Sequence, residues 1–526
     1  MSGRLRRRLV DALPEGILRR AQRIRHRDVR RPDGVDRKVA PAVVADYDAH
    51  AERAALTQSV AAAFDAAGVS YVQVPGQRGL VTQVAVSAED RPTALAALEA
   101  LPGAGWVLRP NPRRQPNPVL VQVHRALASP EGTPVPTSET ACEIAFWTTV
   151  THAGRWRSGG EPHTPGTRLA PNANHVVDYL SADAWQQAVR SPRHWPVEDP
   201  LPEMFEFREP IDLVYTWVDG DDPEWQSRRA AYPHSPEEHH VTAADPARYV
   251  SRDELRYSLR SVAMFARWAR RIYIVTDGQA PEWLDVDHPQ IEVVDHKQIF
   301  GDPSVLPVFN SHAIESQLHH VPGLGEHYLY LNDDFFFGRA VTPEQFFHAN
   351  GIAKFFLGKG TLDLDPPSAR DLPVLSAAKN QRALLERDFG VTVRHKFRHA
   401  PQPQLRSVVQ EMETRYPDLF AQVAASRFRH PDDVSIPSAF AHYYAYATGR
   451  AVPADIHYRY QDLARPDTAR RLDEFLRERP QVFCLNDIDS RREQLDQQRA
   501  TLREFFAAYY PLPSPYEKRD GRTGQK

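Results

Sequence analysis

Residues 211–218 read IDLVYTWV and run directly into the acidic turn DGDD at 219–222. Two further runs of branched and aromatic residues stand at 272–276 (IYIVT) and 291–294 (IEVV), and a fourth, YLYL, stands at 328–331. Short apolar runs that are bounded by turn residues are typical of strands buried on both faces. We therefore predict four buried strands in this part of the chain.

Helical patterns separate these strands. Residues 253–269 place Leu255, Leu259 and Val262 on one face, and a further helix is predicted around residues 312–320. Strands that alternate with helices indicate an α/β domain with a mainly parallel, nucleotide-binding sheet of the Rossmann-like or GT-A-like kind. Ligands bind beyond the carboxyl ends of the strands in such sheets, and the polar clusters of this sequence stand at those ends.

The overall composition is that of a globular protein with more than one domain. The chain has 526 residues, of which 25% are charged and 41% hydrophobic, and its formal net charge is -3. These values exclude a disordered or fibrous protein for the bulk of the chain. They also argue against a dedicated nucleic-acid binder, which usually carries a strongly basic domain. Two cysteines are too few for a disulfide framework.

Composition divides the rest of the chain into segments. Residues 51–130 combine helical and strand-like patterns and predict a small N-terminal α+β domain, whereas the proline-rich residues 131–205 predict a linking region. Residues 206–510 contain the four strands and form the predicted catalytic domain. The polar residues 511–526 predict a disordered tail.

The first segment, residues 1–31, is strongly basic. It holds eleven arginines and three acids, with leucine and isoleucine recurring at helical spacing. Two interpretations stay open, an amphipathic helix on an anionic membrane surface and a disordered, solvated tail. Because we find neither a secretory signal nor an apolar membrane span, we expect a cytoplasmic protein, peripheral on the inner face of the plasma membrane in the first case.

The motif NDD at 332–334 follows the fourth strand and lies within an apolar stretch. Burying unpaired carboxylates is costly, so Asp333 and Asp334 need a cation, hydrogen bonds or solvent at the strand end. Magnesium binds carboxylate oxygens and keeps positions open for phosphate, which makes a metal site one interpretation. A strand end capped by Asn332 and the two acids is the other.

Two clusters precede this motif along the chain. Gly220 permits a tight turn and a close approach of the backbone to a ligand, so Asp219 and Gly220 predict a nucleotide or sugar contact, with an ordinary turn as the alternative. Arg252, Arg256 and Arg260 are spaced by four residues on the predicted helix. Such a row can clamp phosphate oxygens, and a solvated, salt-bridged face is the alternative.

Histidine stands beside cations twice in the later sequence. His399 belongs to RHKFRHAP at 394–401, and His430 follows Arg429 in SRFRHPDD at 426–433. Histidine titrates near neutrality and suits a general base, and arginine can neutralise charge on a phosphoryl group in transfer. Each cluster taken alone is equally compatible with a basic surface loop.

Together these motifs resemble the Stealth family of sugar-phosphate transferases. This family includes bacterial capsular and exopolysaccharide phosphotransferases and the catalytic part of eukaryotic GlcNAc-1-phosphotransferase. Four blocks match in order over about residues 210–490: IDLVYTWVDG at 211–220; DELRYSLRS at 253–261, continuing through 274–279 and 313–316 to YLNDD at 330–334; residues 379–444; and VFCLND at 482–487. Four blocks in this order are far more specific than any single motif.

The resemblance implies an activity and a set of site residues. A UDP-sugar would donate its sugar 1-phosphate, GlcNAc 1-phosphate being our first expectation, to a hydroxyl of an acceptor glycan, with release of UMP. Matched block by block, the essential residues of the family fall on Asp334, His399, Arg429 and Asp487, with Asp489 as an alternative to the last. Within the same blocks we expect substrate contacts from Asp219, Gly220, Arg256, Arg260, Glu315, Asn332 and His430.

The implied chemistry agrees with these residue types. The donor diphosphate is already activated, so the protein mainly has to position it and to neutralise charge. We expect Mg²⁺ or Mn²⁺ on Asp334, assisted by Asp333 and Asp487. Arg429, joined by the helix arginines, would bind the phosphate that moves, and His399 would take the proton of the attacking hydroxyl.

Other functions stay open on the sequence alone. A glycosyltransferase with the same donor would break the sugar C1–O bond and release UDP. A non-catalytic glycan-binding or membrane scaffold protein would need no intact site. The N-terminal region could serve as a partner-binding module. The sequence leaves the donor sugar, the acceptor and the oligomeric state undecided.

Overall fold

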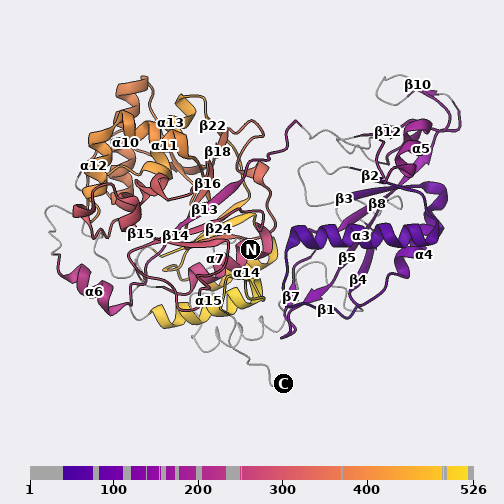
Figure 1. Cartoon of the computed structure of the whole chain (residues 1–526), viewed down its shortest axis with the longest axis horizontal. Helices are drawn as coiled ribbons and strands as arrows, with labels where there is room; N and C mark the ends of the chain where they lie inside the picture. Colours follow the sequence, from indigo (N-terminus) through magenta and orange to yellow (C-terminus); the bar gives the residue numbers. More distant parts are fainter. Residues whose placement is uncertain are drawn as a thin grey trace, which may run out of the picture.

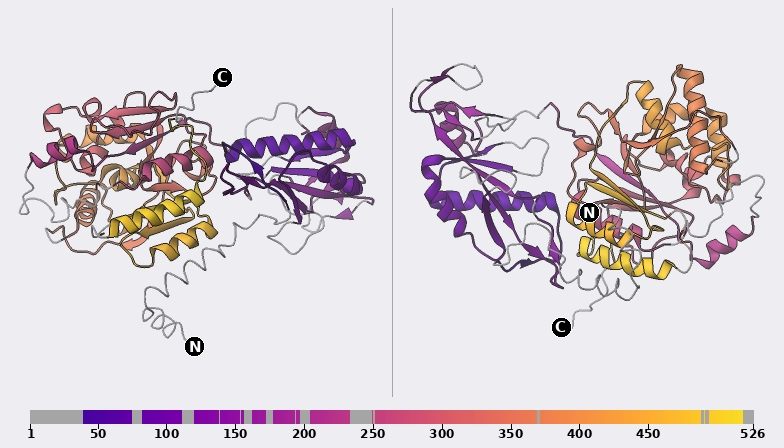
Figure 2. Two further views of the ribbon diagram at one scale, coloured as in Figure 1. Left: turned by 90° about the horizontal axis from the view of Figure 1, so that it is seen from below. Right: turned by 180° about the vertical axis from the view of Figure 1, so that it is seen from behind.

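A computed structural model describes most of the chain as two domains that lie side by side (Figure 1). The described residues are 39–74, 82–110, 120–137, 139–152, 154–155, 162–171, 177–192, 194–196, 204–232, 249, 251–368, 371–487, 490 and 494–518. The basic segment 1–31 and the candidate acid Asp489 therefore lie outside the described residues. The domains are equally distinct from below and from behind (Figure 2).

The C-terminal domain is built on a mainly parallel sheet. Its strands are β13 (Ile211–Thr216), β14 (Ile272–Thr276), β15 (Ile291–Asp295), β16 (His327–Asn332) and β21 (Gln402–Leu405), in the order β15-β14-β13-β16-β21. The pairs among β13, β14, β15 and β16 are parallel, and β21 is antiparallel to β16. The four apolar runs of the sequence are these parallel strands, which confirms the predicted α/β domain.

Alternation along the strands decides which side chains meet which helices. Leu213 and Tyr215 of β13 belong to the core that contains α7 (Glu254–Phe265), whereas Val214 belongs to the core on the other face. That second core includes residues of three short helices: α8 (His296–Ile299), α9 (Ser311–Glu315) and η5 (Leu318–His320). The helix predicted around residues 312–320 is therefore two short pieces, α9 and η5.

A second sheet brings a late part of the chain beside the end of β16. It has the order β17-β24-β23, formed by β17 (Phe335–Phe337), β24 (Val482–Asn486) and β23 (Tyr458–Asp462). β17 begins directly after Asp334 and pairs antiparallel with β24, which fixes the carboxyl end of β24 next to the NDD motif. Helices α14 (Thr468–Glu478) and α15 (Leu495–Tyr509), in yellow in Figure 1, pack against this sheet through Phe475, Phe505 and Phe506.

The remaining elements of this domain are short ladders and helices. They are α6 (Pro223–Ala230), η4 (Pro303–Val305), η6 (Pro343–Gln345), β18 (Ala353–Phe355) paired with β22 (Ala451–Pro453), β19 (Leu357–Thr361) paired with β20 (His395–Phe397), α10 (Pro373–Phe389), α11 (Arg406–Arg415), α12 (Pro417–Ala425), the π-helical turn η7 (Ile436–Phe440) and α13 (Ala441–Ala447). Among the described helices, none has the length and apolar composition that crossing a bilayer requires.

The N-terminal domain is larger than the sequence predicts. Its main sheet has the order β12-β11-β8-β3-β2, with β5 also beside β8 and β4 beside β5. These strands are β2 (Tyr71–Val74), β3 (Thr82–Ser87), β4 (Trp106–Pro110), β5 (Leu120–Arg125), β8 (Cys142–Thr149), β11 (Arg168–Leu169) and β12 (Tyr179–Leu180). The prediction of a linking region at 131–205 is wrong at β8, which lies inside the sheet and contributes Ile144 and Phe146 to its core.

Helices cover both faces of this N-terminal sheet. One core contains residues of α3 (Ala49–Ala67) and α4 (Arg91–Glu99), and the other contains residues of α5 (Ala182–Arg190). The smaller elements are β1 (Ala42–Val43), β6 (Leu127–Ala128) and β7 (Pro134–Val135) in one sheet, β9 (Gly154–Arg155) paired with β10 (Pro162–His163), and η1 (Ala88–Asp90). Arg267 of the C-terminal domain holds the start of this unit through two hydrogen bonds to Asp46, of 2.6 and 2.9 Å.

The end of the described chain packs against the C-terminal domain. Leu512 and Tyr516 belong to its core, and Glu517 is 6% exposed. The prediction of a disordered tail from residue 511 is therefore wrong for residues 511–518, because their apolar side chains fill space beside α7 and α15. Residues 519–526 lie outside the described residues.

Candidate active site

Asp334 stands at the carboxyl end of β16 with one oxygen satisfied and one not. Its Oδ2 accepts hydrogen bonds from Nδ2 of Asn486 (3.1 Å) and Sγ of Cys484 (3.4 Å), both on β24. Its Oδ1 is buried and has no hydrogen-bond partner among the described residues. Burial raises the pKa of Asp334 to about 6, against the lowering effect of the Asn486 and Cys484 hydrogen bonds. Such an oxygen calls for a cation or a proton.

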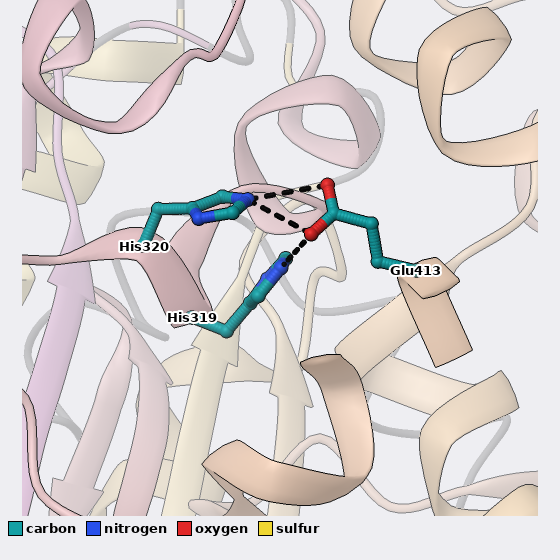
Figure 3. Close-up of side chains that lie close together, drawn as sticks. All are labelled: His319, His320 and Glu413. Atoms are coloured by element: carbon teal, nitrogen blue, oxygen red, sulfur yellow. Dashed lines mark hydrogen bonds and ion pairs between the residues drawn. The ribbon is translucent and has the colours of Figure 1, made fainter. Parts of the chain in front are cut away.

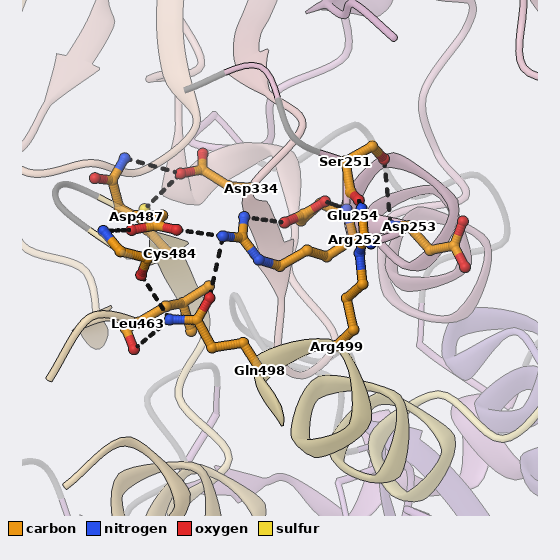
Figure 4. A network of polar contacts seen from close by, with 12 residues as sticks. Ser251, Arg252, Asp253, Glu254, Asp334, Leu463, Cys484, Asp487, Gln498 and Arg499 are labelled. Atoms are coloured by element: carbon orange, nitrogen blue, oxygen red, sulfur yellow. Dashed lines mark hydrogen bonds and ion pairs between the residues drawn. The ribbon is translucent and has the colours of Figure 1, made fainter. Parts of the chain in front are cut away.

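Asp487 is held in a buried network with Arg252 (Figure 4). The two side chains form an ion pair and are only 6% and 2% exposed. Arg252 also donates to Oε1 of Gln498 (3.1 Å) and lies 3.6 Å from Oε1 of Glu254. The other oxygen of Asp487 accepts from the Ser490 amide (3.0 Å). Both oxygens of Asp487 are therefore engaged, unlike those of Asp334.

A backbone turn presents this arginine and glutamate together. Asp253 lies between them at φ 65° and ψ 21°, the left-handed region that non-glycine residues adopt only at a cost. Glu254 then begins α7, and burial raises its pKa despite the nearby Arg252. The turn directs a cation and a carboxylate toward the ends of β16 and β24.

The acids at these strand ends fit a divalent cation. Burial, and then the neighbouring Glu254 and Asp334, raise the pKa of Asp333 well above its usual value. A cluster of carboxylates that lack enough positive partners is the kind of oxygen ligand set that Mg²⁺ and Mn²⁺ take. Among the described residues, however, Asp333, Asp334 and Asp487 do not bring three ligand oxygens within 4.8 Å of one another. The unpartnered Oδ1 makes Asp334 the best ligand of the predicted set.

His399 lies in a cavity of about 800 Å³ that opens between β19, β20 and β23. Its ring is 5.5 Å from that of Tyr460. Burial raises the pKa of Tyr460, which in turn lies near enough to Asp334 and Asp487 for their charges to raise it further. The cavity wall is rich in cations: it includes Lys359, Lys396, Arg398 and Arg459. The ring is exposed to solvent, yet desolvation by its neighbours, together with the charges of Arg429 and Lys396, lowers the pKa of His399. The imidazole is therefore neutral near pH 7 and able to accept a proton.

Arg429 reaches the site from the loop after α12. It donates to Oγ of Ser311 (2.9 Å) at the start of α9, and it is near enough to His399 to influence its titration. Glu315, at the end of the same helix, accepts from Oγ of Ser438 (2.9 Å) and interacts with Tyr330, whose hydroxyl donates to Oδ1 of Asn332 (2.7 Å). These polar groups form a layer under the strand ends.

His430 lies on the same loop as Arg429. Its side chain is 39% exposed, and its Nδ1 accepts from the amide of Asp432 (3.2 Å). Its predicted contact with a substrate stays a prediction.

The loop at Asp219 and Gly220 is held by the neighbouring strand end. Gln279 accepts from the Asp219 amide (3.0 Å) and donates to the Asp219 carbonyl (3.1 Å). A Cβ on Gly220 would lie 2.1 Å from the carbonyl oxygen of Tyr249. Glycine is therefore required here by the chain itself, and its contact with a substrate stays a prediction. Asp219 remains at the correct edge of the sheet for a substrate contact.

Arg256 and Arg260 do not lie with the other candidates. Nε of Arg256 donates to Glu517 (2.6 Å), and Arg260 donates to both oxygens of the same carboxylate (2.7 and 2.8 Å). The pairing of both arginines with Glu517 favours the salt-bridged alternative over the predicted phosphate clamp for these two residues. Arg252 of the same row turns instead toward Asp487.

Sequence reasoning missed two residues that the structure brings to the site and predicted another role for a third. Glu254 lies inside a quoted motif, and its position at the start of the predicted helix could have marked it. Arg252 is predicted as part of a phosphate clamp but pairs with Asp487. Tyr460 stands in the alternating run HYRYQD at 457–462, a strand pattern that was available in the sequence. Its proximity to His399 depends on pairing between β23 and β24, which the sequence does not reveal.

Four regions of one protein family match the chain. They are described as Stealth protein conserved region 1 at residues 209–234, region 2 at 248–355, region 3 at 398–446 and region 4 at 473–526. Asp334 falls in region 2, His399 and Arg429 in region 3, and Asp487 in region 4. The matched regions therefore contain all four of these residues, whereas the cavity strands β19, β20 and β23 lie between the regions.

Two exopolysaccharide phosphotransferases are similar in sequence to this chain. The chain is 43% identical over 493 residues to Exopolysaccharide phosphotransferase SCO6023 of Streptomyces coelicolor, covering 89% of this chain and 83% of that protein. It is 41% identical to Exopolysaccharide phosphotransferase CpsY of Mycobacterium tuberculosis, strain H37Rv, over 62% of this chain and 61% of the relative.

Among solved structures, the galactosyltransferase LgtC resembles 56% of this chain over 95% of its own length, with 12% identity and a TM-score of 0.29. That likeness is too slight to bear on function. The sequence relatives and the four matched regions agree with one another. The chain therefore belongs to the Stealth family, beside these exopolysaccharide phosphotransferases, and is an enzyme that transfers phosphorus-containing groups.

Proposed function

We propose that this enzyme transfers a sugar 1-phosphate from a UDP-sugar to a hydroxyl of an acceptor glycan and releases UMP. The relatives named exopolysaccharide phosphotransferases support a glycan acceptor. The observation that carries the proposal is a cation-lined cavity that contains His399. The charge of Arg429 acts on His399, and that of Asp334 acts on Tyr458 and Tyr460 of the cavity wall. GlcNAc 1-phosphate is the first group to test.

The acceptor hydroxyl would be activated by His399. Because its imidazole is neutral near pH 7, one of its ring nitrogens takes the hydroxyl proton as the oxygen attacks. The new bond forms between that oxygen and the phosphorus that carries the sugar. The bond from this phosphorus to the bridging oxygen breaks, and the electron pair leaves with UMP. No oxidant or further reactant is needed.

Charge on the transferred phosphoryl group would be met by Arg429. A guanidinium can bind two phosphate oxygens at once, which positions the group and neutralises it. Ser311 fixes one side of this guanidinium through a 2.9 Å hydrogen bond. Lys396 adds positive charge from the cavity wall.

Asp334, assisted by Asp333, would hold Mg²⁺ or Mn²⁺ through its unpartnered oxygen. A cation there would supply charge neutralisation for the diphosphate and the leaving UMP. Asp487 would act mainly by holding Arg252 in place. Asp219, Asn332, Glu315 and His430 are proposed to line the substrate site around these groups.

The test is a turnover assay that separates the two possible nucleotide products. The full chain is incubated with UDP-GlcNAc, Mg²⁺ and a panel of sugar acceptors, and the products are followed by ³¹P NMR and nucleotide chromatography. UMP together with a new phosphodiester resonance supports the proposal. Release of UDP would instead indicate a glycosyltransferase and would overturn the mechanism.

A pair of arginine variants tests the assignment of the phosphate ligand. We expect Arg429→Ala to reduce kcat/KM by roughly 100-fold or more, since a phosphoryl contact is lost. Arg256→Ala is the matched control, because that guanidinium pairs with Glu517. It should retain activity within about threefold. Equal losses in both variants would contradict this placement of the two arginines.

We also propose that the basic segment 1–31 contacts anionic lipid on the cytoplasmic side of the membrane. Eleven arginines provide the charge for such a contact. Co-sedimentation with vesicles that contain anionic lipid should fall when these residues are deleted. Unchanged co-sedimentation would favour a solvated tail.

A further inference from the structure

Two adjacent histidines and a glutamate converge on one point away from the cavity (Figure 3). His319 and His320 come from η5, and Glu413 comes from the last turn of α11. Nε2 of His319 lies 2.8 Å from Oε2 of Glu413, and Nε2 of His320 lies 3.1 and 3.2 Å from its two oxygens. One ligand atom of each residue lies within 4.8 Å of the others.

This cluster is separate from the candidate active site. η5 precedes β16, so the cluster belongs to the amino end of that strand, whereas Asp334 follows its carboxyl end. A six-residue strand spans about 20 Å. None of the three side chains has a role in the proposed transfer. A function of this cluster therefore does not depend on the proposed function.

The charge states of His319 and Glu413 suit a metal ion. His319 is fully buried, and burial lowers its pKa, so the imidazole is neutral near pH 7. Burial alone would raise the pKa of Glu413, but its hydrogen bonds to His319 and His320 outweigh this and lower the pKa to about 2. A neutral imidazole and an ionised carboxylate are the forms in which these side chains bind metals.

The spacing and the surroundings also suit one particular ion. Ligand atoms at the usual zinc distances of about 2.0–2.2 Å in a tetrahedral site lie about 3.3 Å apart, close to the separations seen here. His320 and Glu413 are 38% and 32% exposed, which leaves a side open for water. Two histidines, one glutamate and a water form a common ligand set of zinc. Phe420 packs edge-on against His319 and shields the inner side.

We propose that His319, His320 and Glu413 bind a Zn²⁺ ion that ties η5 to α11. The ion would add to an existing contact between these helices, because Arg406 of α11 donates a hydrogen bond to the carbonyl of His319 (3.0 Å). α9, which carries Glu315 and Ser311, lies just before η5 in the chain, so the ion would steady the floor of the active site. Its role is structural, and the ion takes no part in the transfer.

The affinity should be moderate. Nδ1 of His319 is buried and has no hydrogen-bond partner among the described residues. A metal-bound histidine usually donates this second N–H to an acceptor, and loss of such a partner weakens binding by about 10–100-fold. We therefore expect a dissociation constant on the order of micromolar for Zn²⁺.

Cobalt offers a direct probe, because Co²⁺ in a zinc site gives visible absorption that reports its ligands. The full chain is freed of metal with a chelator and titrated with Co²⁺ and then with Zn²⁺. We expect one Co²⁺ per chain, displaced by one Zn²⁺, and a rise in Tm of about 3 °C at saturating zinc. His320→Ala and Glu413→Gln should weaken binding by at least about 100-fold.

The variants are chosen so that each outcome is informative. His320 and Glu413 are partly exposed, so their replacement should leave the fold intact, which the melting curve of the metal-free variants checks. His395→Ala removes an exposed imidazole on β20 and should bind Co²⁺ like the parent chain. An unchanged cobalt spectrum in His320→Ala, or no zinc bound by the parent chain, would overturn the proposal and leave a hydrogen-bonded cluster. Neither result depends on UMP release.

Discussion

Buried aspartates stand near both ends of the strands of the five-stranded sheet, and they differ in how their oxygens are satisfied. Asp212, near the start of β13, is fully buried and has a donor for each oxygen: Nε of Arg270 reaches Oδ1 at 2.8 Å, and the Gly325 amide reaches Oδ2 at 2.8 Å. A second nitrogen of Arg270 also pairs with Oδ2. Asp334, beyond the end of β16, leaves Oδ1 without a donor.

The contrast separates a carboxylate that holds the fold from one that is kept available. At the amino edge, the charge of Asp212 is neutralised within the protein, so nothing further can bind it. At the carboxyl edge, three acids lie close together and Arg252 is already shared between Asp487 and Glu254. Buried charge that the fold does not neutralise costs stability, and such sites are where function is expected.

The largest expected effect is on turnover in Asp334→Asn. Loss of the charge that would hold the cation should lower kcat by roughly 1,000-fold, measured as UMP release. The same change should stabilise the fold. The protonated form of Asp334 contributes stability that is fully present below pH 3.8 and is lost as the pH rises through about 6. At pH 7 the asparagine variant should therefore gain up to about 3 kcal/mol in the free energy of unfolding.

Urea unfolding at pH 7 and pH 4 supplies the control for that variant. The gain should shrink at pH 4, where the parent Asp334 is largely protonated. A variant that loses both activity and stability would contradict the idea that this carboxylate is held under strain. Asp334 would then be a carboxylate that stabilises the fold, as Asp212 is.

The same substitution at the other edge should have the opposite effect on stability. Asp212→Asn removes one partner of the pair with Arg270, whose side chain is 39% exposed. Breaking a fully buried pair costs about 3–5 kcal/mol, so this half-exposed one should cost about 2–3 kcal/mol in urea unfolding. Turnover below the melting range should change little. An unchanged free energy of unfolding would contradict the idea that Asp212 stabilises the fold and Asp334 does not.

The sequence predicts the strands and the acids at their carboxyl ends. Apolar runs that end in NDD and DG motifs predicted both the parallel strands and the location of the acids, because a buried strand and its polar end are local features. Which acid is satisfied could not be predicted, since Arg270 and Gly325 reach Asp212 from 58 and 113 residues away. The predicted N-terminal domain was too short for the same reason, because β8 pairs with β3 although more than 50 residues, including α4, β4 and β5, lie between them.

The arginine row shows where a helical pattern is insufficient. Spacing by four residues places Arg256 and Arg260 on one face of α7, but it does not say what covers that face. The cover is Glu517, more than 250 residues later. His399, Arg429 and Asp487 were assigned through the family resemblance, and the residues alone left them as candidates among other basic and acidic loops.

A third variant tests that covering contact. Glu517→Gln should destabilise the fold by about 2 kcal/mol, because the side chain is 4% exposed and both arginines lose their charged partner. Hydrogen bonds to the arginines lower the pKa of Glu517 against the effect of burial, so its contribution is present above pH 4.5 and lost at more acidic pH. Urea unfolding at pH 7 measures the change, and kcat should stay within about threefold. A large loss of kcat would return these arginines to the site.

The smallest expected effect is a shift in the pH profile, which tests whether the carboxyl edge is open to a cation. Turnover should fall as the pH drops below about 6, since protonated Asp334 has no charge left for Mg²⁺. Protonation of His399, whose pKa is lowered from 6.5, should add to this fall. In His399→Gln the added loss should disappear while that due to Asp334 remains.

Magnesium concentration decides which group is responsible for the first step. A proton and Mg²⁺ compete for the same carboxylate, so a tenfold rise in Mg²⁺ at subsaturating levels should move the acid limb by up to about one pH unit toward lower pH. A closed carboxylate such as that of Asp212 would give no such shift. If the acid side of the pH profile does not move as the Mg²⁺ concentration rises, Asp334 does not bind the metal. Its raised pKa would then reflect burial alone.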